Sequence, residues 1–309
     1  MLVFILRKTL RALLTMFLVV TFTFLILRIS GDPTEVMFPD DVPQEVKDAY
    51  RTAWGLDRPL PEQFAKYLIS VGHGDLGYSF RDSRPALEVV TERIPATLRL
   101  GLCSFALSVC LGIPLGLCAA FRRNTFLDRL ATSVSVMGYS MPNFFLGILL
   151  ILLFSLKLRL LPSSGSATPE HLIMPMITLG TATAGIVARF TRTAVLDVLG
   201  QPFVTAARAK GLSMPRLIFG HVLPNAAIPV ITVLGLQLGA VIGGALVTET
   251  VFAWPGIGRL LVQSVNYRDL AVVQTIVLII AASMIVCNLL VDMAYGWLDP
   301  RIRSEKRGN

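Results

Sequence analysis

The sequence predicts an all-α protein that crosses a membrane several times. Only 16% of its 309 residues are charged, 54% belong to the hydrophobic set, and the mean hydropathy is +0.67. A soluble domain of this size carries about 25% charged residues. The apolar residues come in blocks, and a block of about 20 residues matches the roughly 30 Å hydrocarbon layer at 1.5 Å rise per residue. Several such blocks favour a polytopic membrane protein over a soluble one.

Six transmembrane helices are predicted from these blocks. The first follows a basic N-terminus and resembles a signal sequence, but no small-residue cleavage site comes after it, so an uncleaved span is expected. Prolines inside the blocks are tolerated because a helix bundle re-satisfies the freed carbonyl groups, and they predict kinks at Pro114, Pro142, Pro175 and Pro229. The predicted spans are residues 9–29, 97–120, 131–156, 172–196, 227–251 and 271–297.

The distribution of Lys and Arg predicts that both termini are cytoplasmic. In a six-span arrangement, four basic segments fall on one side: the N-terminus, the turn after the second span, the loop after the fourth span and the C-terminal tail. An odd number of spans would place the two basic ends on opposite faces. Because the net charge of +8 comes largely from these segments, the lipid bilayer is the expected partner and nucleic acid is not.

This topology divides the chain into four parts and places one long loop on the cytoplasmic side of the core, at residues 197–227. A short amphipathic stretch from Glu62 to Ile69 predicts a helix in the long outer segment. The parts are the N-terminal tail and first span (1–30), an extracytoplasmic helical segment (31–95), a five-span core (96–300) and a cytoplasmic basic tail (301–309).

The loop at residues 197–227 has the pattern of two helices joined at a glycine. Its first half predicts a helix with a face of small side chains, ended by Gly211 as glycine commonly ends helices. Its second half predicts a short helix from about Ser213, after which Leu223–Asn225 turns the chain back toward the membrane. A compact helix of this kind suits docking into a groove on a partner, and an ordinary amphipathic linker is the alternative. The small side chains belong to Ala206, Ala207 and Ala209.

This loop is similar to the EAA loop of bacterial ABC importers, a motif of their membrane subunits with the pattern E-A-A-x₃-G-x₉-I-x-L-P. The chain departs from the pattern twice, with Thr205 at the Glu position and His221 at the Ile position. The first departure removes a carboxylate, and with it any ionic contact that this Glu makes to an ATPase. The string T-A-A-R-A-K-G-L is similar to the dipeptide, oligopeptide and nickel subgroup. The matching residues are Ala206, Ala207, Gly211, Leu223 and Pro224.

Further short motifs extend the resemblance along nearly the whole chain. Their order and their topological sides resemble the first of the two permeases in such importers. The resemblance implies the type I ABC importer permease fold and a location in the bacterial inner membrane. The motifs include Gly31-Asp32-Pro33, Gly74–Ser79, Gly138–Pro142, Thr248–Arg259 and Asp299–Arg303.

The resemblance also implies a complex of several chains. In such importers a second homologous permease, two cytoplasmic ATPases and an extracytoplasmic solute-binding protein work together. The chain has no G-x-x-x-x-G-K-[ST] phosphate loop, so we expect no catalytic residue and no cofactor in it, with ATP and Mg²⁺ bound by the ATPases. The residues implied in coupling to the ATPases are Thr205, Ala206, Ala207, Gly211, His221, Leu223 and Pro224.

The implied solute is a di- or oligopeptide. Glutathione and a nickel chelate are alternatives within the same class, because those permeases look alike. A secondary transporter is the alternative from another class, and it would need buried charges or broken helices near the midplane in two related halves. Neither feature is evident in the sequence.

The fifth span supplies candidates for the solute pathway. Gly235, Gly239 and Gly243 recur at four-residue spacing, which lets helix backbones approach closely in lipid. The resemblance implies that this span lines the pathway, and packing inside the bundle is the alternative. Glu249, near the outer end of the span, is a candidate for gating or for facing the binding protein, with a structural salt bridge as the alternative. The cysteines and histidines have no metal-site spacing, so no metal is expected.

Overall fold

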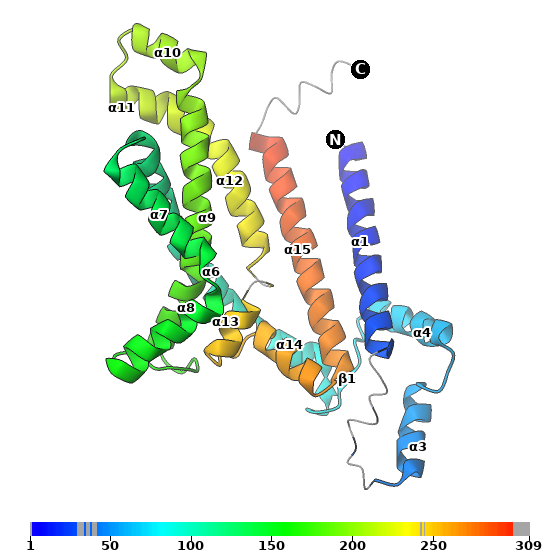
Figure 1. The fold of residues 1–309 in the computed structure, drawn as a ribbon. Coiled ribbons are helices and arrows are strands. Elements are labelled where there is room, and N and C mark those ends of the chain that lie inside the picture. The colour runs from blue at the N-terminus through cyan, green and yellow to red at the C-terminus, as the bar shows by residue number, and fades with distance from the viewer. Residues whose placement is uncertain are drawn as a thin grey trace. The chain divides into compact units, whose positions relative to one another are not determined.

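A computed structural model describes residues 2–29, 34, 38, 42–241, 243 and 245–298. The motifs predicted at Gly31–Pro33 and Asp299–Arg303 and the basic tail at 301–309 lie outside the described residues. In chain order (Figure 1), the elements are α1 (Leu2–Ile29), α3 (Gln44–Trp54), α4 (Leu60–Gly72), β1 (Tyr78–Ser79), β2 (Arg84–Pro85), α5 (Ala86–Thr91), α6 (Ile94–Phe121), α7 (Phe126–Ser140), α8 (Asn143–Leu150), η1 (Ile151–Lys157), η2 (Pro169–Leu172), α9 (Ile173–Leu199), α10 (Pro202–Ala209), α11 (Met214–Leu217), η3 (Ile218–Val222), α12 (Leu223–Gly239), α13 (Leu246–Val251), α14 (Ile257–Asn266) and α15 (Leu270–Leu298).

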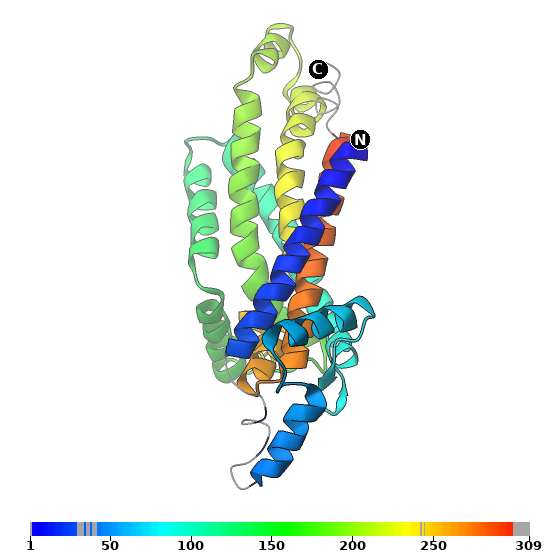
Figure 2. The ribbon, with the colours of Figure 1, turned by 90° about the vertical axis from the view of Figure 1, so that its right-hand side faces the viewer.

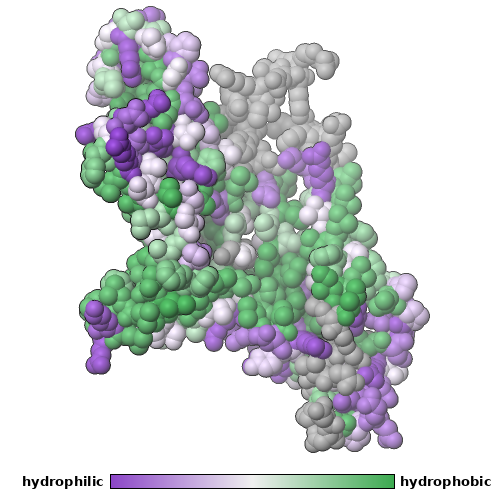
Figure 3. Space-filling view, viewed as in Figure 1, coloured by the Kyte–Doolittle hydropathy of each residue, from purple (hydrophilic) through white to green (hydrophobic). Residues whose placement is uncertain are grey.

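The prediction of an all-α polytopic membrane protein is confirmed. Among the described residues, five helices are long and apolar enough to cross a membrane, and a sixth crossing results when the bent pair of α7 with α8 and η1 counts as one span. Large apolar side chains are exposed along α1, including Leu13, Phe17 and Phe22, and its surface is largely hydrophobic in Figure 3. Because water penalises exposed apolar surface of this extent, lipid is its expected surroundings.

The predicted third span, residues 131–156, is not one straight helix. The axis bends by 99° between α7 and α8. Pro142 lies in the break and has no backbone N–H to donate, and the residue before it, Met141, is extended with ψ 123°, as steric contact with the proline ring favours. The kink predicted at Pro142 is confirmed, and it is large enough to separate two helices.

The predicted fifth span, residues 227–251, was too long at its C-terminal end. α12 ends at Gly239, turns follow at the described residues up to 245, and the short helix α13 then begins. Glycine is about 1 kcal/mol less favourable than alanine inside a helix, so the glycines at 239 and 243 favour an end to the helix. Hydropathy does not report this preference, which explains the error.

The structure divides into two compact units, residues 1–97 with 255–285 and residues 98–254 with 286–309. In the second unit, α9 packs against α6, α7, α8 and α12, and Figure 2 shows α7, α9 and α12 running alongside one another. The closest approach is at glycines: a Cβ on Gly116 of α6 would lie 2.5 Å from the carbonyl oxygen of Ala188, and one on Gly185 would lie 2.3 Å from that of Ser135. Backbone contact through small residues is a common way for helices to associate in membranes.

In the first unit, aromatic side chains hold α4 against α1. The Phe24 ring lies 5.2 Å from the Phe64 ring and 5.7 Å from the Tyr67 ring between centroids. The hairpin of β1 and β2, which pairs antiparallel, is joined to the start of α15 by a hydrogen bond from the Ser79 hydroxyl to the Asp269 carboxylate, 2.5 Å long. The outer segment was predicted to be helical, and this hairpin was missed because its strands have only two residues each.

Candidate functional site

The loop between α9 and α12 has the predicted pattern of two helices joined at a glycine. α10 ends at Ala209, and Gly211 follows with φ +77°, in the left-handed region that suits glycine. The Gly211 amide donates to the carbonyl of Arg208 at 2.9 Å, and the Leu212 amide donates to that of Ala207 at 3.2 Å. These bonds satisfy carbonyls that a helix end leaves without partners. The prediction that Gly211 ends the first helix is confirmed.

The second half of the loop differs from the prediction in one respect. Ser213 precedes α11 as expected, but Leu223–Asn225 does not turn the chain. The chain is helical without a break from Met214 to Gly239, and Pro224 lies in the first turn of α12 after the wider turns of η3. Proline has no amide to donate, but the wider turns of η3 directly before Pro224 already interrupt the regular i→i−4 pattern, so the Leu-Pro-Asn string is compatible with a continuous helix. The chain reverses earlier, around Gly211.

Three apolar side chains of this segment are fully buried: Val204 on α10, Leu217 on α11 and Val222 on η3. They belong to one apolar cluster with residues of α6, α9 and α12, among them Val195 and Ala226. Sequence reasoning missed these residues because it concentrated on the motif positions; their apolar character at helical spacing was the available signal. The cluster therefore packs α10 and α11 against three spans, α6, α9 and α12.

Five of the seven residues implied in coupling lie between α10 and η3, and Leu223 and Pro224 begin α12. Ala207 and Leu223 are half-buried and the other five are exposed. Three large apolar side chains beside them are also exposed: Phe203, Met214 and Phe219, the last by 71%. Charged residues between positions 201 and 225 are all basic. They are Arg208, Lys210 and Arg216.

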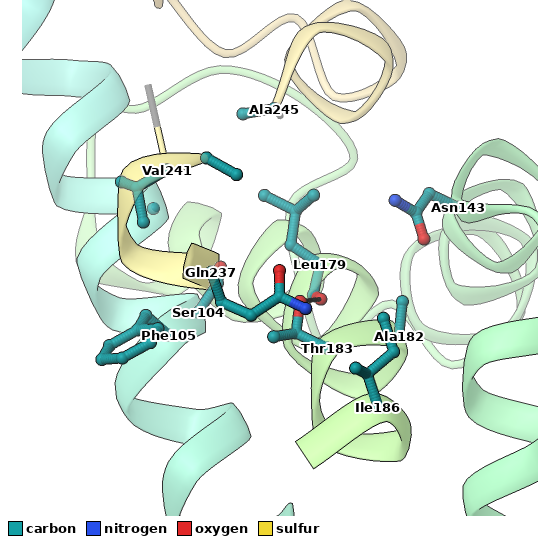
Figure 4. A pocket seen from close by; sticks show the side chains of 12 residues that line it. Ser104, Phe105, Asn143, Leu179, Ala182, Thr183, Ile186, Gln237, Val241 and Ala245 are labelled. Carbon is teal, nitrogen blue, oxygen red and sulfur yellow. Dashed lines mark hydrogen bonds between the residues drawn. The ribbon is translucent and has the colours of Figure 1, made fainter. Parts of the chain in front are cut away.

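A cavity of about 270 Å³ lies within the second unit, between α6, α9 and the end of α12 (Figure 4). None of its twelve lining residues is ionisable. Most of its wall is apolar, and Figure 4 shows the carboxamides of Asn143 and Gln237 extending into the space. The lining residues are Gly101, Ser104, Phe105, Asn143, Leu179, Ala182, Thr183, Ile186, Gln237, Ala240, Val241 and Ala245.

The polar groups of this cavity are of two kinds. The hydroxyls of Ser104 and Thr183 donate to carbonyls of their own helices, at 2.8 and 3.3 Å. The carboxamides of Asn143 and Gln237 are half-buried and make no side-chain hydrogen bond to any described residue. Each carboxamide offers two donors and an acceptor. The cavity therefore presents uncharged hydrogen-bonding groups on an apolar wall, an arrangement suited to amide groups of a solute.

The four residues predicted for the pathway lie apart from this cavity's lining. Gly235 and Gly239 are on α12, and a Cβ on Gly239 would lie 3.3 Å from the Cβ of Cys287 on α15. Gly243 lies in the turn after α12, so it does not continue the helix face of the other two. Glu249 is fully buried in α13. Residues near these in sequence, such as Gln237 and Val241, line the cavity instead.

A pair of opposite charges links α7 and α9. The Arg192 guanidinium contacts both carboxylate oxygens of Asp128, with Nε at 2.8 Å and an Nη at 3.0 Å. Asp128 is buried and also accepts the backbone N–H of Asn124 at 2.9 Å. Bidentate, charge-assisted geometry of this kind is among the stronger polar interactions. The pairing was not predicted, although Asp128 stands alone as an acid among the basic residues of that turn.

Family models match most of the chain. The model described as "Binding-protein-dependent transport system inner membrane component" matches residues 112–304. The model for the N-terminal part of binding-protein-dependent transport system membrane components matches residues 1–101. Together they cover both compact units and the loop with α10 and α11.

Curated relatives match over nearly their whole length. The chain is 41% identical over 304 residues to the glutathione transport system permease protein GsiC of Pectobacterium atrosepticum, covering 98% of this chain and 99% of that one. It is 38% identical over 339 aligned residues to the dipeptide transport system permease protein DppB of Escherichia coli K12, covering 99% and 100%.

Two solved transporters resemble the fold. An amino acid ABC transporter with histidines matches with a TM-score of 0.56 and 17% identity, covering 67% of this chain and 92% of that one. An inward-facing MetNI methionine ABC transporter matches with a TM-score of 0.58 and 19% identity, covering 68% and 96%. At these identities the likeness concerns the fold alone.

Proposed function

Because the chain belongs to the family of binding-protein-dependent transport system inner membrane components, we propose that it forms half of the solute pathway of an ATP-driven importer. It is a multi-span protein of the inner membrane with the fold of type I ABC importer permeases. The observation that carries the proposal is the segment from α10 to the start of α12, which presents most of the EAA-like residues at the surface and is joined to α6, α9 and α12 through a buried apolar cluster.

The partners follow from this role. A second homologous permease completes the pathway, a solute-binding protein delivers the solute from outside, and two cytoplasmic ATPases bind ATP and Mg²⁺. When the two ATPases bind ATP and close on each other, they move the segment. The apolar cluster around Val204 and Leu217 transmits this movement to α9 and α12. The permease itself carries out transport and makes no chemical bond.

The surface of the segment indicates the chemistry of the ATPase groove. Its exposed apolar side chains, of which Phe219 is the most exposed, need an apolar pocket. Its three charged side chains are all basic, and Thr205 replaces the acid of the usual motif. The groove therefore presents carboxylates to Arg208, Lys210 and Arg216. Because position 205 is a threonine, the groove needs no basic residue opposite it.

For the solute, the cavity favours di- and oligopeptides. The free carboxamides of Asn143 and Gln237 can pair with peptide amide groups of any sequence. The cavity lacks an ionisable side chain, so it neither selects nor repels a particular side-chain charge. Glutathione remains the second candidate because of the 41% identity to a glutathione permease. Its two carboxylates give it net negative charge, for which the cavity offers no cation.

Competitive uptake distinguishes the two solutes. In cells that lack the gene for this chain, the plasmid-borne gene is expected to restore uptake of a labelled dipeptide, and unlabelled mixed di- and tripeptides should compete for it. Glutathione in the same excess should compete poorly. A chain with Asn143→Leu serves as the comparison, because it keeps the volume and removes the carboxamide. Uptake of glutathione alone, insensitive to dipeptides, would assign the second solute and contradict the first.

A further inference from the structure

A second cavity, of about 500 Å³, lies within the first unit below the α4 helix. Its walls come from the end of α1, one face of α4, the turn before β1 and the start of α15. Figure 2 shows α4 crossing the end of α1. The lining residues are Arg28, Gly55, Leu56, Gln63, Lys66, Tyr67, Ser70, Asp75, Leu76, Gly77, Tyr78, Leu270, Ala271 and Gln274.

The cavity lies at the depth where the membrane ends. The apolar window of α1 runs from Lys8 to Ile26, two residues before Arg28, and that of α15 starts at Leu270, in the cavity wall. This is the side that the distribution of Lys and Arg predicts to be extracytoplasmic. Next to Arg28, the side chains of Ile26 and Ile29 are exposed. The cavity thus combines a polar wall with apolar surface that continues toward the hydrocarbon layer.

The polar wall carries both signs of charge. Arg28 and Lys66 bring two cationic side chains, and the Lys66 ammonium has no ion-pair partner among the described residues. Asp75 brings one carboxylate, of which a single oxygen accepts the Gly77 amide at 2.9 Å. Both Lys66 and Asp75 line the cavity and are exposed. Two cations and one anion in one cavity suit a zwitterion better than a simple anion.

Two neutral side chains of the same α4 face, buried Gln63 and half-buried Tyr67, have buried polar atoms that are incompletely paired. The Gln63 amide nitrogen donates to the carbonyls of Leu56 and Arg58, at 3.1 and 2.7 Å, while its oxygen accepts nothing from any described residue. The Tyr67 hydroxyl also has no partner in the described part of the chain. Burial raises the pKa of Tyr67 to about 12, so the hydroxyl keeps its proton and is a donor at neutral pH. Unpaired buried polar groups are costly unless a ligand or water pairs with them.

We propose that this cavity binds the phosphoethanolamine headgroup of an outer-leaflet phospholipid, with its phosphate at Lys66 and Arg28 and its ammonium at Asp75. The acyl chains then follow the exposed apolar face of α1 into the bilayer. A peptide also has two termini of opposite charge, but it has no acyl chains to use the position at the membrane boundary. The bound lipid fixes α4 against α1, next to the aromatic contacts of Phe24.

Thermal unfolding of the purified full-length chain in detergent tests the proposal. Short-chain phosphatidylethanolamine should raise the midpoint, and the same concentration of short-chain phosphatidylglycerol should raise it less. Lys66→Gln and Asp75→Asn should each weaken the response to phosphatidylethanolamine about tenfold in apparent affinity, as expected for one charge-assisted hydrogen bond. Lys157→Gln is the matched control, because Lys157 is an exposed lysine of the second unit, outside the cavity.

Four results would overturn the proposal. If phosphatidylethanolamine does not raise the unfolding midpoint, the cavity does not bind this lipid. If Lys157→Gln weakens the response as much as Lys66→Gln does, the response is a general effect of charge. An equal response to glycerophosphoethanolamine removes the requirement for acyl chains. A response to a dipeptide such as Ala-Ala, with none to lipid, assigns the cavity to the solute. Because the two tested side chains are exposed, their replacement does not compromise folding.

Discussion

Replacement of Gly211 by valine isolates the backbone geometry of the coupling segment. A Cβ at this position would meet no atom within 4 Å beyond the adjacent residues, so there is space for the Cβ. The cost that the structure shows comes from φ +77°, because an L-residue in the left-handed region costs about 1–2 kcal/mol and a β-branched one more. Since 1.4 kcal/mol corresponds to a factor of ten, the native turn between α10 and α11 becomes about tenfold less populated.

The expected result is a separation of ATP hydrolysis from transport. With the assembled importer in proteoliposomes, Gly211→Val should lower solute uptake about tenfold per ATP hydrolysed, while the amount of chain in the membrane stays the same. Gly220→Val is the matched control: Gly220 lies on the same segment, its Cβ would also meet nothing within 4 Å, and its φ is not positive. Wild-type coupling in Gly211→Val, or an equal loss in Gly220→Val, would refute the reasoning.

Three further outcomes are expected. Asp128→Asn leaves the half-exposed Arg192 guanidinium without its carboxylate and should destabilise the chain by roughly 1–3 kcal/mol, the cost of removing one partner of a charge-assisted hydrogen bond; a thermal midpoint equal to that of wild type would contradict this. Gln237→Leu should raise the solute concentration for half-maximal uptake several-fold without changing basal ATPase activity, and unchanged transport kinetics would remove the carboxamide from the pathway. Burial raises the pKa of Asp269 in spite of the hydrogen bond from Ser79, so the folded state favours the protonated carboxyl. The stability that this carboxyl contributes is complete below its unfolded pKa near 3.9 and is lost as pH rises through its folded pKa. Protection of the hairpin amides against hydrogen exchange should therefore fall with rising pH in wild type and stay constant in Asp269→Asn; identical profiles would refute this.

The sequence predicted features that depend on local chemistry. Gly211 was correctly placed at a helix end because glycine is the residue that adopts a left-handed backbone at little cost. Pro142 was correctly placed at a kink because it lacks an amide donor. The membrane-spanning character followed from hydropathy alone. Each of these inferences needs only the residue and its near neighbours along the chain.

Features that depend on three-dimensional packing were not predicted. Hydropathy extended the fifth span through the turns after Gly239, because it measures transfer to lipid and not helix propensity. The glycine spacing on that span drew attention to Gly243, whereas the closest backbone contacts are at Gly116 and Gly185. The cavity carboxamides come from α8 and α12, about 90 residues apart in sequence, and nothing in either local sequence indicates the other.

The source of energy for uptake tests the central claim most directly. The chain is reconstituted with the second permease, the ATPases and the binding protein, and the vesicles receive either ATP on the ATPase side or a proton gradient without ATP. The account predicts dipeptide uptake with ATP, its loss when hydrolysis is blocked, and none with the gradient alone. Uptake that persists in the proton gradient without ATP would contradict it and make the chain a secondary transporter.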